Sequence, residues 1–496
     1  MSDTPLWTYD AFLAAMNARP LGARPETIAG ISIDSRSVEP GEAFFAIRGD
    51  TFDGHAFASS ALARGAATAV VADSRLSGLG RTKGSLTIVD DVMDALRALA
   101  VAARARSSAG IVAVTGSVGK TGTKEMLAQA LAADGPVHYS HASFNNHWGV
   151  PLTLARMPSA AKYGVFEIGM NHPGEIEPLA KLVRPQVAIV TIVEPVHLEY
   201  FKDVKAIARA KAEIFLGVEP GGAAILNRDN PHYALLAKLA REAGVERIVG
   251  FGEHARAELH LDAVSLKQDC SCISATILGE KVSYKLGAPG RHLVQNSLAA
   301  LGAVSLLGAD LAKALLALAE LRAPKGRGER HILEFRKGAA TLIDESYNAN
   351  PASMRAAIAL LGQAQPDRHG RRIAVLGDMR ELGKNSAKMH AALAEALAAA
   401  SVDAVFAAGP LMRSLWDALP EARRGGYAET AAELEPAVLG ALAPGDVIMV
   451  KGSHASRMDS LVETLRTRFA ATAVEDGQEQ EAWSAEGATG IKQETS

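Results

Sequence analysis

The sequence predicts an α/β protein of three domains, because of its length, its alternating segments and one glycine-rich loop. The chain has 496 residues, a length that favours about three domains, and its 48% hydrophobic and 22% charged residues suffice to fill several cores. Apolar strand segments alternate with helical segments in two stretches, which is typical of parallel sheets with crossover helices. We expect a small N-terminal α/β domain, a central P-loop ATPase-type parallel sheet domain and a C-terminal Rossmann-like domain.

The expected domains follow one another along the chain. Residues 1–108 form the first domain, which ends in a Ser-Ser-Ala-Gly stretch. The second domain, 109–322, has expected strands at 111–115, 165–168, 187–192 and 223–226. The third domain, 323–473, has expected strands at 340–343, 372–376, 404–408 and 447–450. Residues 474–496 are polar, acidic and without periodicity, so we expect a disordered tail.

Charge and cysteine content argue against several classes of function. The formal net charge of −3 gives no electrostatic reason to expect nucleic acid or an anionic membrane as a partner. Cys270 and Cys272 are separated by a single residue, so a disulfide bond between them would be strained. Their spacing also does not match that of cysteines in a metal site. The sequence has no apolar run of about eighteen residues and no signal-peptide pattern. We expect a cytoplasmic protein without membrane insertion.

The stretch IVAVTGSVGKTGTK, residues 111–124, indicates a phosphate-binding loop between a strand and a helix. Glycines let backbone N–H groups turn toward a polyphosphate, and the helix N-terminus adds the positive end of its dipole. Lys120 supplies a charge and the Thr121 hydroxyl is a ligand for Mg²⁺, although Val114 replaces the first glycine of the general pattern. We therefore expect ATP with magnesium. The residues expected at ATP here are Thr115, Gly116, Ser117, Val118, Gly119, Lys120, Thr121 and Gly122.

Two further groups that suit a magnesium ion follow other strands of the same expected sheet. Glu167 closes one strand and His197 follows the next. A cation that bridges phosphates accepts a carboxylate while keeping several waters. Each residue alone is more simply a satisfied carboxylate or a loop histidine, but neighbouring strand ends bring the two to one edge. We expect both to bind metal, with Lys211 of the helical run ARAKAEIF in the same site.

The order of the motifs resembles one known family. The blocks are TGSVGKT, FNNHWGVPLTL, FEIGMNHPGEI, EPVHLEYF, AKAEIF, GRHLVQNSLAA, DESYNANPASM, LGDMRELG and VKGSHASRM. Over residues 31–465 they resemble the Mur ligases, ATP-dependent amide ligases of peptidoglycan precursor synthesis. The blocks NNHWGVPLT, DESYNANP and VKGS are most similar to the branch that joins D-alanyl-D-alanine to a UDP-N-acetylmuramoyl-tripeptide.

The resemblance implies that CO₂ carbamylates Lys211 and that the carbamate holds a second Mg²⁺. Only the neutral amine attacks CO₂, and a lysine with a pKa of about 10.4 is neutral in about one molecule in a thousand at neutral pH. The site must therefore favour the neutral amine or stabilise the carbamate, which a nearby Mg²⁺ does. The alternative is a helix lysine paired with residues near Glu213 or with solvent.

The resemblance also assigns residues to the nucleotide and to catalysis. Asn296 matches an asparagine that hydrogen-bonds adenine, as suits a side chain with both a donor and an acceptor. Leu293 stands where the family usually has a second asparagine. Glu345 stands where relatives often have an aspartate near the ATP ribose and phosphates. The residues expected to be catalytic are Lys120, Glu167, His197 and Lys211.

The expected substrate contacts lie in all three domains. Ser35, Arg36 and Arg48 match the family's UDP-binding region, and arginine suits a pyrophosphate because of its forked donors. The alternative for these residues is an exposed turn. Helix capping is the safer interpretation of at least one third-domain asparagine, and the alternatives for Lys451 and Ser453 are a surface lysine and a helix-capping serine. The other residues expected at the substrates are Asn145, Asn146, Tyr347, Asn348, Asn350, Lys451 and Ser453.

The resemblance implies that ATP phosphorylates the tripeptide carboxylate and that the dipeptide amine attacks the acyl phosphate while the third domain closes. The alternatives are a sibling ligase that adds one amino acid, a folylpolyglutamate synthase-like ligase, and a nucleotide-binding scaffold without activity. The DESYNANP and NNHWGVPLT blocks argue against the first two, and the magnesium ligands with Lys211 argue against the third. By analogy with the family we expect a monomer.

Overall fold

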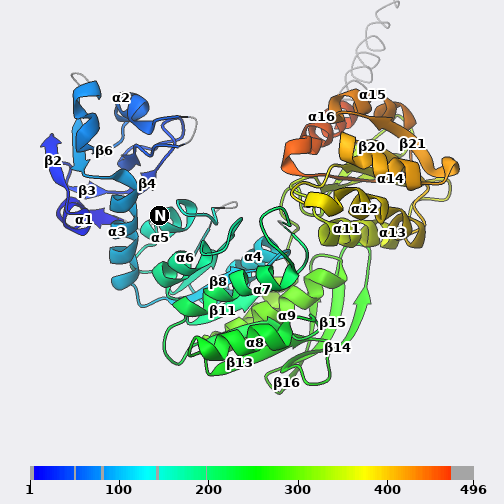
Figure 1. The fold of residues 1–496 in the computed structure, drawn as a ribbon, viewed down its shortest axis with the longest axis horizontal. Helices are drawn as coiled ribbons and strands as arrows, with labels where there is room; N and C mark the ends of the chain where they lie inside the picture. The colour runs from blue at the N-terminus through cyan, green and yellow to red at the C-terminus, as the bar shows by residue number, and fades with distance from the viewer. Residues whose placement is uncertain (1–4, 50–51, 80–82, 141–143, 197, 471–496) are drawn as a thin grey trace, which may run out of the picture.

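The structure is a computed structural model that describes residues 5–49, 52–79, 83–140, 144–196 and 198–470. Three α/β domains follow one another, and Figure 1 shows the blue first domain and the yellow-to-red third domain on opposite sides of the central domain. The expected fold class is confirmed. The tail expected at 474–496 lies outside the described residues. Within the described ranges, no helix has the length and apolar character needed to cross a membrane.

The first domain is built on a sheet of strand order β2-β7-β6-β5-β4, which is parallel except for β2 at one edge. Asp91 begins α3, because its carboxylate accepts hydrogen bonds from two backbone N–H groups of the first turn. The strands are β1 (Trp7–Thr8), β2 (Arg19–Gly22), β3 (Thr27–Ile28), β4 (Gly30–Ser32), β5 (Glu42–Phe45), β6 (Thr68–Ala72) and β7 (Ser85–Val89). The helices are α1 (Tyr9–Met16), α2 (Ala58–Ala63) and α3 (Val92–Ala105).

The central domain has a sheet of order β16-β15-β14-β13-β12-β11-β8-β10-β9, parallel from β9 to β14. The antiparallel extension formed by β14, β15 and β16 was not expected from the sequence. The strands are β8 (Gly110–Thr115), β9 (Val137–Tyr139), β10 (Tyr163–Glu167), β11 (Val187–Val190), β12 (Ala223–Asn227), β13 (Arg247–Gly252), β14 (Leu259–Leu266), β15 (Ser271–Ile277) and β16 (Glu280–Leu286). The helices are α4 (Lys120–Ala132), α5 (Gly149–Ala155), α6 (Ile176–Val183), α7 (Val204–Ala212), α8 (Tyr233–Glu242), α9 (Arg291–Leu306) and α10 (Leu311–Leu318).

The third domain has a sheet of order β17-β18-β22-β19-β20-β21, parallel except for β17. All the parallel strands that the sequence predicted in this domain are present. The strands are β17 (Glu329–Glu334), β18 (Ala339–Glu345), β19 (Arg372–Gly377), β20 (Ala404–Ala408), β21 (Arg424–Ala428) and β22 (Val447–Lys451). The helices are α11 (Pro351–Gln363), α12 (Ser386–Ala391), α13 (Leu393–Ala399), α14 (Arg413–Ala418), α15 (Ala431–Ala441) and α16 (Met458–Ala470).

Buried hydrophobic side chains connect the first two domains but not the third. A single cluster of buried side chains runs from Trp7 and Phe12 of the first domain to Val150 and Ile207 of the central domain. Among the described residues, the clusters of the third domain contain no side chain from the other two domains. The first and central domains therefore share a core, whereas the third domain packs its own.

Candidate active site

The predicted phosphate-binding loop lies between β8 and α4, at the carboxyl edge of the central sheet. Gly116 and Gly119 have φ angles of +154° and +86°, a region that side chains rarely adopt. A Cβ atom at Gly116 would overlap the Thr191 hydroxyl, and one at Gly119 would press on the Asn296 amide. Both positions therefore require glycine, and the second brings the expected adenine-binding Asn296 directly against the loop.

Side-chain hydrogen bonds hold this loop in place. The Ser117 hydroxyl donates to the Glu194 carbonyl oxygen at 3.0 Å and accepts from the Glu194 backbone N–H at 2.9 Å. The Thr191 hydroxyl donates to the Val118 carbonyl oxygen at 2.6 Å. Both partners belong to the segment that follows β11, so the loop is fixed by the neighbouring strand. A loop held in this way is preorganised for its ligand.

The side chain of Lys120 folds back over the phosphate-binding loop. Its Nζ donates to the Gly116 carbonyl oxygen at 2.8 Å. Burial lowers the pKa of Lys120; the charge of Glu167 opposes that shift, and the charge of Arg327 adds to it. A phosphate group bound in this loop would place a negative charge beside the Lys120 ammonium group and favour its charged form. This is the role that the sequence predicts for Lys120.

Glu167 lies at the end of β10 with only 1% of its surface exposed. One carboxylate oxygen accepts from the Thr121 hydroxyl at 2.8 Å, and the other accepts from the Asn145 amide at 2.7 Å. Mg²⁺ prefers oxygen ligands at about 2.0–2.1 Å, so adjacent corners of its octahedron lie about 2.9 Å apart. The Thr121 and Glu167 oxygens therefore fit neighbouring positions on one Mg²⁺. His197, the other expected ligand, lies outside the described residues.

Lys211, on α7, is 2% exposed. Burial lowers the pKa of Lys211 well below its usual value, and the charge of Lys120 lowers it further. Among the residues that the structure describes, it has no hydrogen-bond or ion-pair partner. Glu213, two positions on, accepts instead from the backbone N–H groups of Gly174 and Ile176. The surroundings thus favour the neutral amine, which is one of the two conditions that the sequence analysis gives for carbamylation, and the buried Lys211 side chain is not solvated.

A cavity of about 360 Å³ lies between the central and third domains. The phosphate loop and Glu167 form one wall of it, and β18, α11 and the end of β22 form the other. Asn145, Asn296, Glu345, Tyr347, Asn348, Asn350 and Lys451 all line this cavity. The structure therefore brings together most of the residues expected at ATP and at the acceptor end of the substrate, from segments far apart in the sequence.

The third-domain residues of the cavity are partly tied to one another. Lys451 is 2% exposed, and its Nζ donates to the Glu345 carboxylate at 3.2 Å and to the Asn348 carbonyl oxygen at 2.9 Å. It is therefore not a surface lysine. Asn350 begins α11 with a capping box, so its side chain serves the helix. The Ser453 hydroxyl is buried and, within the described part of the chain, has no hydrogen-bond partner.

Sequence analysis did not single out Arg327, which lines the cavity from the segment that joins the two domains. Its guanidinium group lies 4.2 Å from the centre of the Tyr347 ring. Its charge also reaches Lys120, whose pKa it lowers. The sequence signal available was an arginine between two glycines in the loop before the third domain.

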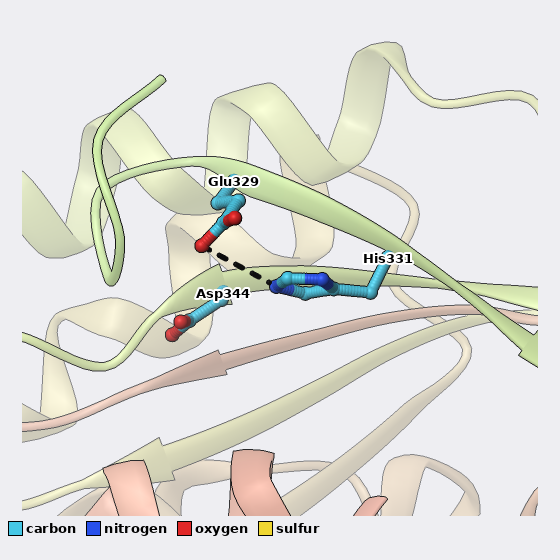
Figure 2. A group of neighbouring side chains, drawn as sticks. All are labelled: Glu329, His331 and Asp344. Carbon is cyan, nitrogen blue, oxygen red and sulfur yellow. Dashed lines mark ion pairs between the residues drawn. The ribbon is translucent and has the colours of Figure 1, made fainter. Parts of the chain in front are cut away.

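A second polar group lies beside this linking segment. Figure 2 shows Glu329 and His331 of β17 facing each other beside Asp344 of β18, with the Glu329 carboxylate 3.5 Å from His331 Nε2. The Asp344 carboxylate accepts from the backbone N–H groups of Gly326 and Ser346 and from the Ser346 hydroxyl. The hydrogen bonds of Asp344 fix the linking segment to β18, which is a structural role.

The residues expected at UDP lie in the first domain and do not line this cavity. Ser35 is buried, whereas Arg36 is exposed and paired with Asp34 at 2.8 Å. Arg48 is exposed and forms an isolated bridge with Asp53. Asn146 lines no part of the cavity either. Its side chain accepts from the Gly149 backbone N–H at the start of α5, which is a capping role.

The family comparisons agree with this architecture. Residues 27–142 match the family described as "Mur ligase family, catalytic domain", residues 114–304 the "Mur ligase middle domain" and residues 327–454 the "Mur ligase, glutamate ligase domain". The chain is 34% identical over 444 residues to the UDP-N-acetylmuramoyl-tripeptide--D-alanyl-D-alanine ligase of Escherichia coli, with 89% of this chain and 94% of that protein covered.

Solved structures show the same likeness. A crystal structure of MurF from Acinetobacter baumannii superposes with a TM-score of 0.81 at 29% identity, covering 94% of this chain and all of the other. MurF ligase from Thermotoga maritima, solved with ADP, gives a TM-score of 0.74 at 26% identity over 89% of this chain and 98% of that one. By sequence and by fold, the chain belongs to the Mur ligase family.

Proposed function

We propose that this protein is the ATP-dependent ligase that joins D-alanyl-D-alanine to UDP-N-acetylmuramoyl-tripeptide, releasing ADP and phosphate in peptidoglycan synthesis. One observation carries the proposal: the phosphate loop and Glu167 face DESYNANP and Lys451 across a single cavity. The named activity of the Escherichia coli relative supports the choice of substrates. Neither the sibling ligase that adds one amino acid nor the folylpolyglutamate synthase is favoured.

For the metal, Thr121 and Glu167 supply oxygen ligands, and we assign His197 to the same Mg²⁺. A carbamate on the buried Lys211 would hold a second Mg²⁺, a proposal supported by the lowered pKa of that amine. Bound magnesium would neutralise phosphate charge. Lys120 stabilises the charge that develops on the transferred phosphoryl group, and Asn145 orients the Glu167 carboxylate through its amide.

The reaction consists of two displacements. The terminal carboxylate of the tripeptide attacks the γ-phosphorus of ATP, an acyl phosphate forms and ADP leaves. The dipeptide amine then attacks the acyl carbon, loses a proton, and displaces phosphate to give the amide. Lys451 is buried beside Glu345, where it supplies positive charge to the wall opposite the phosphate loop.

The remaining assignments are part of the same proposal. Ser35, Arg36 and Arg48 bind the UDP end, within a domain of residues 1–108, and the other domains extend over 109–322 and 323–473. The third domain closes when ATP and substrate bind. The protein acts in the cytoplasm, where Cys270 and Cys272 stay reduced, and as a monomer, which light scattering would check.

The test is ADP release with ATP, Mg²⁺ and UDP-muramoyl-tripeptide, measured with D-alanyl-D-alanine, with single amino acids and with no acceptor. We expect turnover only with the dipeptide, together with a product whose mass equals that of the two substrates minus water. Turnover with a single amino acid would instead assign the protein to a sibling branch. Absence of turnover with every acceptor would contradict the ligase.

A further inference from the structure

The central and third domains touch through an ion pair next to the cavity. Arg355 on α11 of the third domain has its Nη2 atom 3.8 Å from a carboxylate oxygen of Glu194, which follows β11 in the central domain. The Arg355 side chain is 53% exposed and that of Glu194 is 26% exposed. The pair thus bridges the two walls of the site from its rim.

Glu194 is also the residue that anchors the phosphate loop. Its backbone N–H and carbonyl oxygen both hydrogen-bond the Ser117 hydroxyl, as described above. Ser117 itself lines the cavity. One residue therefore contacts the phosphate loop through its backbone and the third domain through its side chain.

Arg355 belongs to a helix that forms part of the opposite wall. Ser353, Ala356 and Ala357 of α11 line the cavity, so the position of this helix sets the distance across the site. A second contact lies close by, where the Glu199 backbone N–H donates to the Glu381 carbonyl oxygen at 3.4 Å. That contact joins the segment after β11 to the segment after β19.

We propose that Arg355 is a positioning residue, whose ion pair with Glu194 holds α11 and the third-domain wall close to the phosphate loop in the closed arrangement of the domains. The inference rests on the proposed function, because it assigns the pair to the arrangement in which ATP and the acceptor meet. An ion pair that is partly exposed contributes little, so losing it should change affinities by no more than about fivefold. The Arg355–Glu194 ion pair controls how the two domains are arranged and does not take part in the chemical step.

The test compares Arg355→Ala, Glu194→Gln and the double variant with wild type. We expect each single variant to raise KM for D-alanyl-D-alanine by about two- to fivefold with kcat nearly unchanged. The double variant should be no worse than either single variant, because both remove the same pair. Arg413→Ala is the matched control, since Arg413 is an exposed third-domain arginine paired within its own helix to Asp417 at 3.1 Å.

Small-angle scattering supplies a readout that does not depend on ligation. With Mg²⁺ and a non-hydrolysable ATP analogue, Arg355→Ala should keep a larger radius of gyration than wild type and than Arg413→Ala. The difference should shrink in about 1 M salt, where the Debye length falls to about 3 Å. Equal radii for Arg355→Ala and wild type, or fully additive effects on KM in the double variant, would overturn the inference. A protein without ligase activity would instead overturn the proposed function, while the scattering comparison still tests the pair.

Discussion

The two joints of the molecule are built differently. Between the first and central domains, Arg156 donates to the Ile31 carbonyl oxygen at 2.6 Å and Arg106 donates to that of Met157 at 3.3 Å. The Trp7 indole N–H of the first domain also donates to the Ala155 carbonyl oxygen of the central domain at 3.4 Å. These bonds surround a hydrophobic core that both domains share.

The joint between the central and third domains lacks such a core among the described residues. Its contacts there include an ion pair at 3.8 Å and a backbone hydrogen bond at 3.4 Å, with the cavity between the walls. Moving the first domain would break apolar packing, which is costly, whereas moving the third domain would mainly exchange polar contacts for water. The comparison predicts that the first and central domains move as one body and that the third domain moves against them.

The largest expected effect concerns stability. Trp7→Ala removes a buried ring from the shared core and should cost about 3–5 kcal/mol of unfolding free energy, lowering one transition common to the first and central domains. Phe406→Ala in the third-domain core should lower only a separate transition. Differential scanning calorimetry with hydrogen exchange of each domain measures both. A Trp7→Ala protein whose central domain keeps its stability would show that the core is not shared energetically.

Removing the charge of Lys120, which lines the cavity between the central and third domains, should lower activity without affecting folding. Lys120→Ala should lower kcat by about a hundred- to a thousandfold, because it removes a charge that stabilises the transferred phosphoryl group. The melting profile should stay close to that of wild type, in contrast to Trp7→Ala. Steady-state ADP release and circular dichroism test the two halves; full activity or an unfolded variant would each contradict the role of Lys120.

The carbamate proposal gives a chemical rescue. Lys211→Ala should be inactive, and a short carboxylic acid such as acetate should restore part of the ADP release by supplying the missing anion. Acetate should leave Lys120→Ala inactive, which makes that variant the control. Failure of acetate with Lys211→Ala, at concentrations that do not inhibit wild type, would count against the carbamate.

Acid should weaken the third domain through one buried histidine. Burial lowers the pKa of His390, whose Nε2 accepts from the Met379 backbone N–H at 3.0 Å, so the folded domain holds this ring neutral. The pKa of His390 in the folded domain lies below its unfolded value of about 6.5. At a pH between these two pKa values the unfolded state binds more protons than the folded state. The third domain therefore loses stability as the pH falls through this range. Calorimetry from pH 7.5 to 5.5 should show the third-domain transition falling, and less so in His390→Gln. An identical slope in that variant would assign the effect elsewhere.

The smallest effect is the movement itself. Spin labels on cysteines at Leu21, Leu316 and Ala432 would report one exposed site in each domain, after the two native cysteines are replaced by serine. With ATP analogue and tripeptide, we expect the distance between Leu21 and Leu316 to stay constant and that between Leu316 and Ala432 to change. A change in the first distance would contradict the rigid joint.

The fold class and the nucleotide loop could be predicted from local patterns along the chain. The loop is readable because strand, glycines, Lys120 and Thr121 lie within fourteen consecutive residues, 111–124, where local geometry decides the structure. The predicted parallel strands are readable because they are continuous apolar runs, whereas the parallel strands β9, β13 and β21 were not predicted. The antiparallel strands β14 to β16 were not predicted, since their edge position rests on pairing with β13 and with one another.

How the site is assembled, and which side chains are buried in it, depends on contacts between distant segments. The hydrogen bonds of Glu167 to Thr121 and Asn145 join residues 46 and 22 positions apart, and the Lys451 contact with Glu345 joins residues 106 apart. Arg327 lines the site although the sequence did not predict it, and the predicted Asn146 caps a helix instead. Both differences arise from where the strands place the loops. Burial of Lys211 and the unequal joints depend likewise on which distant segments pack together, which no local pattern records.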